Sequence, residues 1–216
     1  MSSRPRSFAA GIPVRAARNG AFQLYVAVPA VLAANIPDDI TYAEAAVLPL
    51  GLATAAAGLF QSGYLELPLP AAESARTPGS SAATTNRVVL VWGGSSSVGT
   101  SAIQLAAAVG VRIATTASPR NHEYVKSLGA EWAFDYNSDT VVDDVVAALE
   151  GLELVGVYDA IGDNKTQNAG VKIIKGLAKE TTAKVVTVIG RHDEIRDGVR
   201  VLGCKSHRFF INPFSS

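Results

Sequence analysis

The stretch VVLVWGGSSSVG, residues 88–99, places an apolar run directly before a turn of glycine and serine. The run predicts a buried strand, and the pattern of residues 100–106 predicts a helix that begins at the turn. Small residues let the backbone approach a pyrophosphate closely, and the first N–H groups of the helix can bind its oxygens. Compared with G-x-G-x-x-G, the turn reads Gly94-x-Ser96-x-x-Gly99, with serine in place of the middle glycine. We therefore predict a dinucleotide site here; the alternative is a plain connection between strand and helix.

Strand-like and helix-like segments alternate from Arg87 onward. We expect strands at 88–92, 111–115, 132–135, 154–160, 185–189 and 199–202, and helices near 98–109, 119–128, 139–149 and 165–179. This alternation predicts an α/β fold with a doubly wound parallel sheet, a Rossmann-like NAD(P)-binding domain. Residues 199–203 are expected either as the sixth strand or as an exposed edge open to dimerisation.

The segment after the second predicted strand bears on the choice of cofactor. An NAD site has an acid about 20 residues beyond the turn to hold the ribose 2′-hydroxyl, and residues 113–121 contain none. Ser118 and Arg120 instead offer a hydroxyl and a guanidinium for a 2′-phosphate, which favours NADPH over NADH. In the alternative interpretation Ser118 is a helix N-cap, Pro119 lies in the first turn and Arg120 is solvated.

The first third of the chain has helix signals of its own. Thr41 is followed three residues later by Glu44, which predicts a capping box. Residues 43–60 are apolar almost all round, so we expect a helix buried on more than one side. Pro49 predicts two helical pieces instead of one. Residues 21–28 alternate enough to suggest a strand, and residues 71–86 are typical of a surface linker.

Charge and cysteine content exclude several classes of protein. The chain has 19 Lys+Arg against 19 Asp+Glu, which argues against binding to nucleic acid or to an anionic membrane. A single cysteine, Cys204, allows no internal disulfide, and with His122, His192 and His207 far apart we expect no zinc site. No apolar run reaches the roughly 18 residues of a membrane helix without charge, Gly or Pro.

These features predict a soluble, cytoplasmic protein. The alternative is a targeting segment, because the first 37 residues carry basic residues and no acid. Pro5 and Pro13 interrupt that segment, and no amphipathic helix is evident in it.

Four stretches resemble the zinc-independent branch of the medium-chain dehydrogenase/reductase superfamily. They are GAFQLYVAVPA (20–30), IPDDITYAEAAVLPLGLATAAAGLF (36–60), VLVWGGSSSVGTSAIQLA (89–106) and TASPRNHEYVKSLGA with FDYN (116–130 and 134–137). The chain is most similar to fungal trans-acting enoyl reductases of polyketide pathways and their toxD-like relatives. Serine in the turn is itself typical of that subgroup.

The resemblance implies hydride transfer from NADPH to the β-carbon of an activated enoyl substrate, followed by protonation at the α-carbon. The partner it implies is a small enoyl or carbonyl substrate, with a polyketide synthase as its expected carrier. It implies that Ser95, Ser96, Ser97 and Val98 hold the pyrophosphate, and that Ser118, Pro119, Arg120 and Asn121 contact the 2′-phosphate. Tyr136 would pack near the adenine, or else simply cap a strand. Thr54 would lie beside the nicotinamide, or else bond its own helix backbone.

The resemblance also implies a domain plan. We expect a GroES-like remnant at 1–42, connecting helices at 43–70, a linker at 71–86, the NAD(P)-binding domain at 87–204 and an irregular tail at 205–216. Because most of the GroES-like barrel would be missing, a cofactor-binding chain without turnover, as a truncated paralogue or mispredicted gene fragment, is the alternative to an active reductase. A short-chain reductase is excluded, since no tyrosine has lysine four positions on. A methyltransferase is disfavoured by the missing acid after the second strand.

Overall fold

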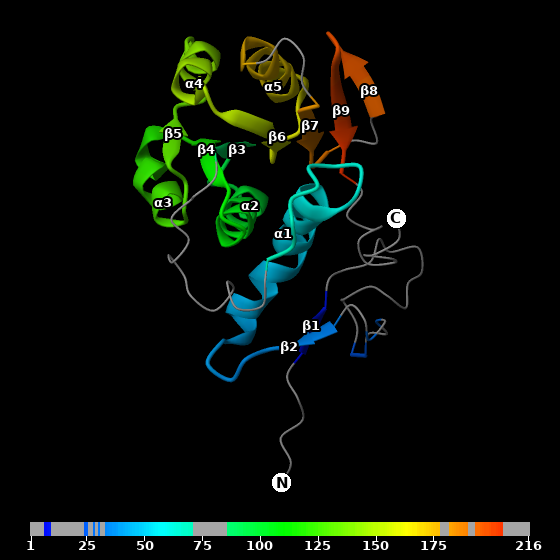
Figure 1. Cartoon of the computed structure of the whole chain (residues 1–216). Coiled ribbons are helices and arrows are strands. Elements are labelled where there is room, and N and C mark those ends of the chain that lie inside the picture. Colours follow the sequence, from blue (N-terminus) through cyan, green and yellow to red (C-terminus); the bar gives the residue numbers. More distant parts are fainter. Residues whose placement is uncertain are drawn as a thin grey trace.

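The strand predicted before the glycine–serine turn is central to a seven-stranded sheet with the order β5-β4-β3-β6-β7-β9-β8 (Figure 1). The computed structural model describes residues 7–9, 24–25, 28, 30, 33–70, 86–177, 182–189 and 193–204. The strands of this sheet are β3 (Arg87–Trp92), β4 (Arg112–Thr116), β5 (Trp132–Phe134), β6 (Glu153–Asp159), β7 (Lys184–Thr187), β8 (Asp193–Arg196) and β9 (Val199–Gly203). Neighbouring strands are parallel except β8 and β9. The predicted doubly wound fold is confirmed.

Helices cover both faces of the sheet, as Figure 1 shows. They are α1 (Tyr42–Phe60), α2 (Ser97–Ala108), α3 (His122–Ser127), α4 (Val141–Leu149) and α5 (Asn164–Leu177), with a 3₁₀ turn at Pro119–Asn121. Val89 and Val91 of β3 pack into a cluster with α1 and α2, while Val88 and Leu90 pack into a second cluster with α4 and α5. Because β3 is buried on both faces, its sequence is a continuous apolar run.

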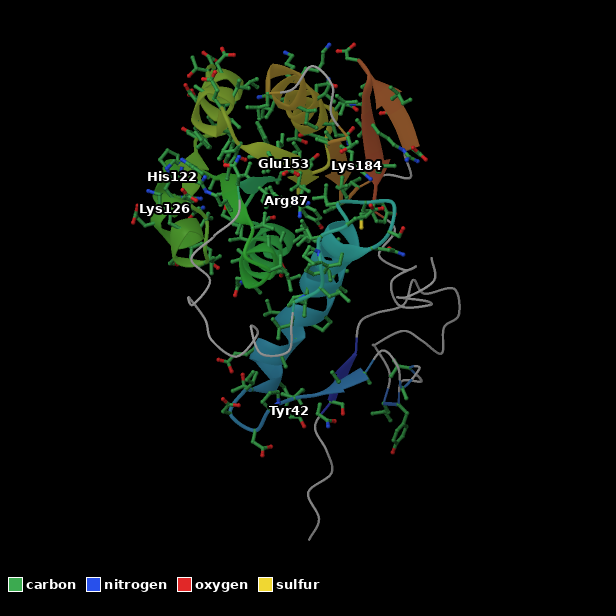
Figure 2. All side chains as sticks on the ribbon, in the orientation of Figure 1. Tyr42, Arg87, His122, Lys126, Glu153 and Lys184 are labelled. Atoms are coloured by element: carbon green, nitrogen blue, oxygen red, sulfur yellow. The ribbon has the colours of Figure 1, made fainter. Side chains whose placement is uncertain are left out.

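Charged side chains lie at the amino ends of the parallel strands, where Figure 2 labels Arg87, Glu153 and Lys184. Arg87 at the start of β3 lies 3.4 Å from Glu153 at the start of β6. Lys184 at the start of β7 donates to the carbonyl of Gly63. The glycine–serine turn lies at the opposite edge of the sheet, where β3 ends.

The β8–β9 hairpin was not predicted. Its turn is Asp197-Gly198, both with positive φ, which is the two-residue turn that suits a hairpin. The short polar strand DEIR has no apolar alternation, so only the Asp-Gly pair could have revealed it. Because β8 pairs with β9, residues 199–203 form an inner strand. Of the two alternatives expected for residues 199–203, the strand is confirmed and the exposed edge was wrong.

Helix α1 corrects two predictions. It runs unbroken through Pro49, and not as two pieces. The predicted capping box holds its start: Glu44 N donates to Thr41 Oγ1, and Thr41 N donates to Glu44 Oε2. Its second half packs so closely on α2 that a Cβ on Gly51 would lie 2.9 Å from Ser97 Oγ. We attribute the continuity to these two anchors on either side of the proline, which offset its lost hydrogen bond.

The expected burial of α1 on several sides holds only in that second half. Residues Ala53, Ala55, Ala57 and Leu59 are buried, whereas Leu50 is 73% exposed. The first half extends beyond the large sheet, toward the β1–β2 pair (Figure 1). By length and composition α1 is also the one helix of the described residues that could cross a membrane, although 39% of its most apolar window is buried in the protein. A core helix passes the same test.

A small antiparallel pair, β1 (Ser7–Ala9) and β2 (Ala33–Asn35), forms a separate sheet. Of the strand expected at 21–28, Leu24, Tyr25 and Val28 are described, and none lies in a strand. Leu24 and Tyr25 are almost fully exposed, so they lack the buried face that would pin a strand. Most of the expected linker and the whole expected tail lie outside the described residues, and the domain boundaries stay a prediction.

Candidate cofactor site

A pocket of about 460 Å³ lies where β3, β5 and β6 end. Its walls come from the turn after β3, the segment after β5 and the turn that leads from β6 into α5. The lining residues are Trp92, Gly93, Ser95, Ser96, Tyr136, Asn137, Ile161, Asp163, Lys165 and Thr166. Strands β3 and β6 are neighbours whose following helices, α2 and α5, cover opposite faces of the sheet. Such a switch point, at the carboxyl ends of the strands, is where open α/β sheets bind ligands.

Three glycines shape the turn after β3. Gly93 has φ +79°, which an L side chain rarely adopts. A Cβ on Gly94 would lie 2.0 Å from Thr115 Oγ1, and one on Gly99 would lie 2.2 Å from the carbonyl oxygen of Gly93. The start of α2 is therefore pressed against the turn, as the sequence predicts for Gly99.

Ser96, the residue that replaces the middle glycine, has a structural role. It is the N-cap of α2: its Oγ accepts from Gly99 N at 3.1 Å and donates to Gly93 O at 2.8 Å. Its hydroxyl thus ties both ends of the turn together. Among the described residues, no acceptor pairs with the N–H groups of Ser97 and Val98. These two N–H groups begin the helix and are the donors available to an anion.

The four residues predicted as a group are therefore not equivalent. Ser95 and Ser96 line the pocket. Ser97 lies against Gly51 of α1, and its carbonyl accepts from the hydroxyls of Thr100 and Ser101. Val98 packs against the core of the α1–α2 face. The side chains of Ser97 and Val98 hold the helix in place, and their backbone is what remains for binding.

The end of β4 abuts the same turn. Gly93 N donates to Thr116 Oγ1, and Gly94 N donates to the carbonyl of Thr116. The predicted 2′-phosphate segment, Ser118–Asn121, follows directly, although none of its residues lines the pocket.

Within that segment, Asn121 Nδ2 donates to Ser118 Oγ at 3.1 Å. Ser118 stands at the N-cap position with Pro119 in the first turn, but its side chain makes no cap bond. Arg120 is exposed and forms no ion pair with any residue that the structure describes.

Tyr136 and Thr54 occupy different surroundings. Tyr136 follows β5, lines the pocket and is 41% exposed. Thr54 is buried in α1 and does not line the pocket. The carbonyl of Thr54 accepts from Tyr158 Oη at 3.0 Å, and the Cys204 thiol lies 3.8 Å from it. Burial raises the pKa of Tyr158 well above its usual value and that of Cys204 to about 12, so both stay protonated near neutrality.

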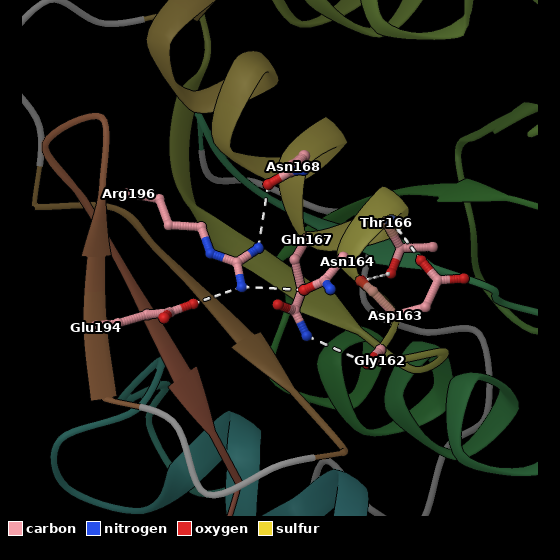
Figure 3. A network of polar contacts seen from close by, with 8 residues as sticks. All are labelled: Gly162, Asp163, Asn164, Thr166, Gln167, Asn168, Glu194 and Arg196. Atoms are coloured by element: carbon pink, nitrogen blue, oxygen red, sulfur yellow. Dashed lines mark hydrogen bonds and ion pairs between the residues drawn. The ribbon is translucent and has the colours of Figure 1, made fainter.

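Sequence reasoning missed the third wall of the pocket, after β6. Asp159 ends that strand and is fully buried. Its carboxylate accepts from Ile161 N, Gly162 N and Thr166 Oγ1, and burial raises its pKa. Asp163 Oδ1 then accepts from Thr166 N at 2.7 Å (Figure 3). An acid at the end of an apolar strand, followed by Asp-x-x-Thr, is the signal that could have found this wall.

Further polar contacts hold the start of α5 from two sides, as Figure 3 shows. Gln167 Nε2 donates to the carbonyl of Gly162. From β8, Arg196 donates to the side-chain oxygens of Asn164 and Asn168. The unpredicted hairpin therefore helps to anchor the helix that carries Lys165 into the pocket wall.

Metal-binding side chains do not gather near the pocket. Within the part of the chain that the structure describes, no group of three or more His, Cys, Asp or Glu residues could hold a metal ion. His122 Nε2 lies 3.1 Å from the carbonyl of Ala117. His192 and His207 lie outside the described residues.

Comparison with known proteins finds similarity to dehydrogenases. Residues 97–179 match the family model described as zinc-binding dehydrogenase. The chain is 49% identical over 143 residues to dehydrogenase pigH of Monascus ruber, covering 66% of this chain and 37% of that protein. It is 44% identical over 153 residues to the trans-enoyl reductase himH of Aspergillus japonicus. That match covers 71% of this chain and 41% of himH.

Among solved structures, an alcohol dehydrogenase superfamily protein from Novosphingobium aromaticivorans has the same fold. The two structures match with a TM-score of 0.63 and 26% sequence identity. The match covers 88% of this chain and 51% of the other chain. The chain spans about half the length, or less, of the proteins that it matches.

Proposed function

Because this chain belongs to the medium-chain dehydrogenase/reductase superfamily, we propose that the protein is an NADPH-dependent oxidoreductase. The reaction is hydride transfer to an activated double bond, as in an enoyl or a quinone-type reductase. The observation that carries the proposal is the pocket at the switch point, where the glycine–serine turn leads directly into α2. The similarity to a trans-enoyl reductase supports the enoyl substrate.

The residues present fit a dinucleotide. The absence of a Cβ at Gly94 and Gly99 lets the turn pack closely on Thr115 and lets the start of α2 pack closely on Gly93. The N–H groups of Ser97 and Val98 would bind the pyrophosphate. Tyr136 would lie beside the adenine. Thr54 would lie near the nicotinamide, in a part of the site that the pocket does not include.

The 2′-phosphate of NADPH would be bound by Ser118 and Arg120. Two observations support this choice over NADH. The guanidinium of Arg120 has no carboxylate partner among the described residues. The end of β4 reads Thr115-Thr116-Ala117, with no acid to hold a free 2′-hydroxyl or to repel a phosphate.

When bound, the cofactor supplies the hydride, and the protein orients it and excludes water. We propose that no zinc takes part. Cys204 is the single cysteine of the chain, whereas a zinc site takes three or four protein ligands. Together with the scattered histidines, it leaves the described residues without a zinc ligand set. The proposed substrate is a small enoyl or carbonyl compound, and its proposed carrier is a polyketide synthase. The proposed location is cytoplasmic.

The test is a titration of the purified chain with NADPH, followed by NADPH oxidation in the presence of enoyl thioesters. We expect enhanced NADPH fluorescence on binding, and oxidation that depends on the thioester. Binding without oxidation would support the second candidate, a cofactor-binding chain without catalysis. Absence of both would contradict the proposed function.

A further inference from the structure

The carboxylate of Asp159 is the one buried acidic side chain of the described residues, and it stands directly behind the pocket wall. One oxygen accepts from Ile161 N at 3.0 Å and Gly162 N at 3.1 Å. The other accepts from Thr166 Oγ1 at 2.8 Å. A carboxylate so far from water is unfavourable unless its oxygens are hydrogen-bonded. These three donors meet that need and fix the turn around it.

The β6–α5 turn, which Asp159 holds, contacts the glycine–serine turn after β3 that is predicted to bind the pyrophosphate. The Ile161 side chain lies against Gly93, since a Cβ on Gly93 would be 2.7 Å from its Cδ1. Gly162 has φ +87° and lies against Ile189, so the turn has little freedom to move elsewhere. A change in the position of Ile161 would therefore alter the packing at the first glycine of the loop.

Thr166 extends the same arrangement into α5. Its Oγ1 lies 2.8 Å from Asp159 Oδ2 and 3.0 Å from the carbonyl of Asp163. Its N–H donates to the Asp163 carboxylate, and both Asp163 and Thr166 line the pocket. One buried carboxylate thus positions the β6–α5 turn on the pocket side.

We propose that Asp159 is a positioning residue of the dinucleotide site, which sets the β6–α5 turn, and through Ile161 the loop at Gly93, at the spacing that binds the cofactor. This inference rests on the proposed function, because the ligand it serves is the dinucleotide. Asp159 does not touch that ligand. It acts through the backbone of Ile161 and Gly162 and through Thr166.

The test compares Asp159→Ala and Asp159→Asn with a matched control, Val145→Ala. Val145 is equally buried, but lies in α4, in the hydrophobic cluster that α4 and α5 form with the sheet, and does not line the pocket. Three quantities are measured: the Kd for NADPH from its fluorescence, the exchange rates of the Ile161 and Gly162 amides without cofactor, and the thermal midpoint.

Asp159→Ala leaves the part-buried N–H groups of Ile161 and Gly162 and the buried Thr166 hydroxyl without their acceptor, so we expect NADPH to bind about tenfold more weakly or worse. Exchange of the Ile161 and Gly162 amides should accelerate by a similar factor. Asp159→Asn keeps one acceptor oxygen for both N–H groups and can donate its amide to Thr166 Oγ1, so its affinity should remain within about threefold of wild type. Val145→Ala should lower the thermal midpoint without changing affinity or the exchange of these two amides.

The outcomes separate the inference from the proposed function. If the wild-type chain does not bind NADPH, the proposed function fails, and this inference with it. If wild type binds and folded Asp159→Ala binds equally well, the inference alone is overturned. Equal losses in Asp159→Asn and Asp159→Ala would also overturn it, because charge and not geometry would then matter. Should Asp159→Ala not fold, Thr166→Val replaces it: we expect severalfold weaker NADPH binding, restored by Thr166→Ser, and an unchanged Kd contradicts the inference.

Discussion

Replacing Gly99 by alanine is predicted to damage stability and cofactor binding together. A Cβ at this position would lie 2.2 Å from Gly93 O, 2.9 Å from Gly94 Cα and 3.0 Å from Gly93 C. All three are backbone atoms, so the strain cannot be relieved by rotating a side chain. Either the start of α2 or the turn must move. The N–H groups proposed to bind the pyrophosphate belong to the segment that would shift.

The magnitude follows from two opposing effects. Alanine is favoured over glycine in a helix by up to about 1 kcal/mol, whereas overpacking a well-packed site costs about 1–3 kcal/mol, and occasionally more. With backbone contacts this short the second effect dominates. We expect a net loss of about 2 kcal/mol in the free energy of unfolding, and NADPH affinity reduced about tenfold or more.

The assay is urea unfolding followed by circular dichroism, with an NADPH titration of each folded variant. Gly170→Ala is the matched control, because Gly170 is also a buried helix glycine packed on the sheet. Its Cβ would meet side-chain atoms of Val185 and Val157 at 3.1 Å and beyond, which can yield. We expect it to change stability by less than about 1 kcal/mol and to leave the Kd for NADPH unaltered. A Gly99→Ala protein that is as stable and binds as tightly as wild type would refute the reasoning.

Three further predictions concern the N-cap of α2, the segment after β4 and the buried cysteine. Ser96→Ala removes the N-cap of α2 and should lower the free energy of unfolding, measured in thermal melts, by about 1 kcal/mol. Ser95→Ala is the control: the Ser95 side chain makes no cap hydrogen bond among the described residues, so the free energy of unfolding should change little. Arg120→Ala should weaken NADPH binding about tenfold and NADH binding hardly at all, because a charge-assisted hydrogen bond to the 2′-phosphate contributes about 1.5–3 kcal/mol. Equal losses of affinity for the two cofactors would exclude this contact. The pKa of the Cys204 thiol is raised by burial to about 12, so the unfolded chain ionises first and stability should fall as the pH rises from about 9 toward 12. Cys204→Ala should remove part of that decline in alkaline urea titrations, and an identical pH profile would contradict the assignment.

The sequence was most informative where local pattern and packing agree. The strand from Val88, the turn and α2 form one continuous signal, and Thr41 with Glu44 marked the start of α1 correctly. Pro49 was misleading because a local rule for helix breaking ignores a capping box before the proline and a packed surface after it. The β8 strand had no apolar alternation, and its partner β9 is what makes it a strand.

The candidate site was predictable on one side only. The turn at Gly94 to Gly99 has a known spacing, whereas the opposite wall depends on contacts made after the sheet has formed. Asp159 is an ordinary acid in the sequence, and burial alone gives it its role. Likewise, Ser96 was expected to bind phosphate, but in the fold its hydroxyl joins Gly93 to Gly99.

Hydrogen exchange at the start of α2 tests the central claim most directly. The N–H groups of Ser97 and Val98, which have no acceptor among the described residues, should exchange at least about tenfold more slowly when the chain is saturated with NADPH, as expected for a charge-assisted hydrogen bond of about 1.5–3 kcal/mol. Amides in α4, on the other side of the sheet, serve as the internal reference. Saturation with NADPH that leaves Ser97 and Val98 exchanging at their original rates would contradict the claim that this turn and helix bind the cofactor.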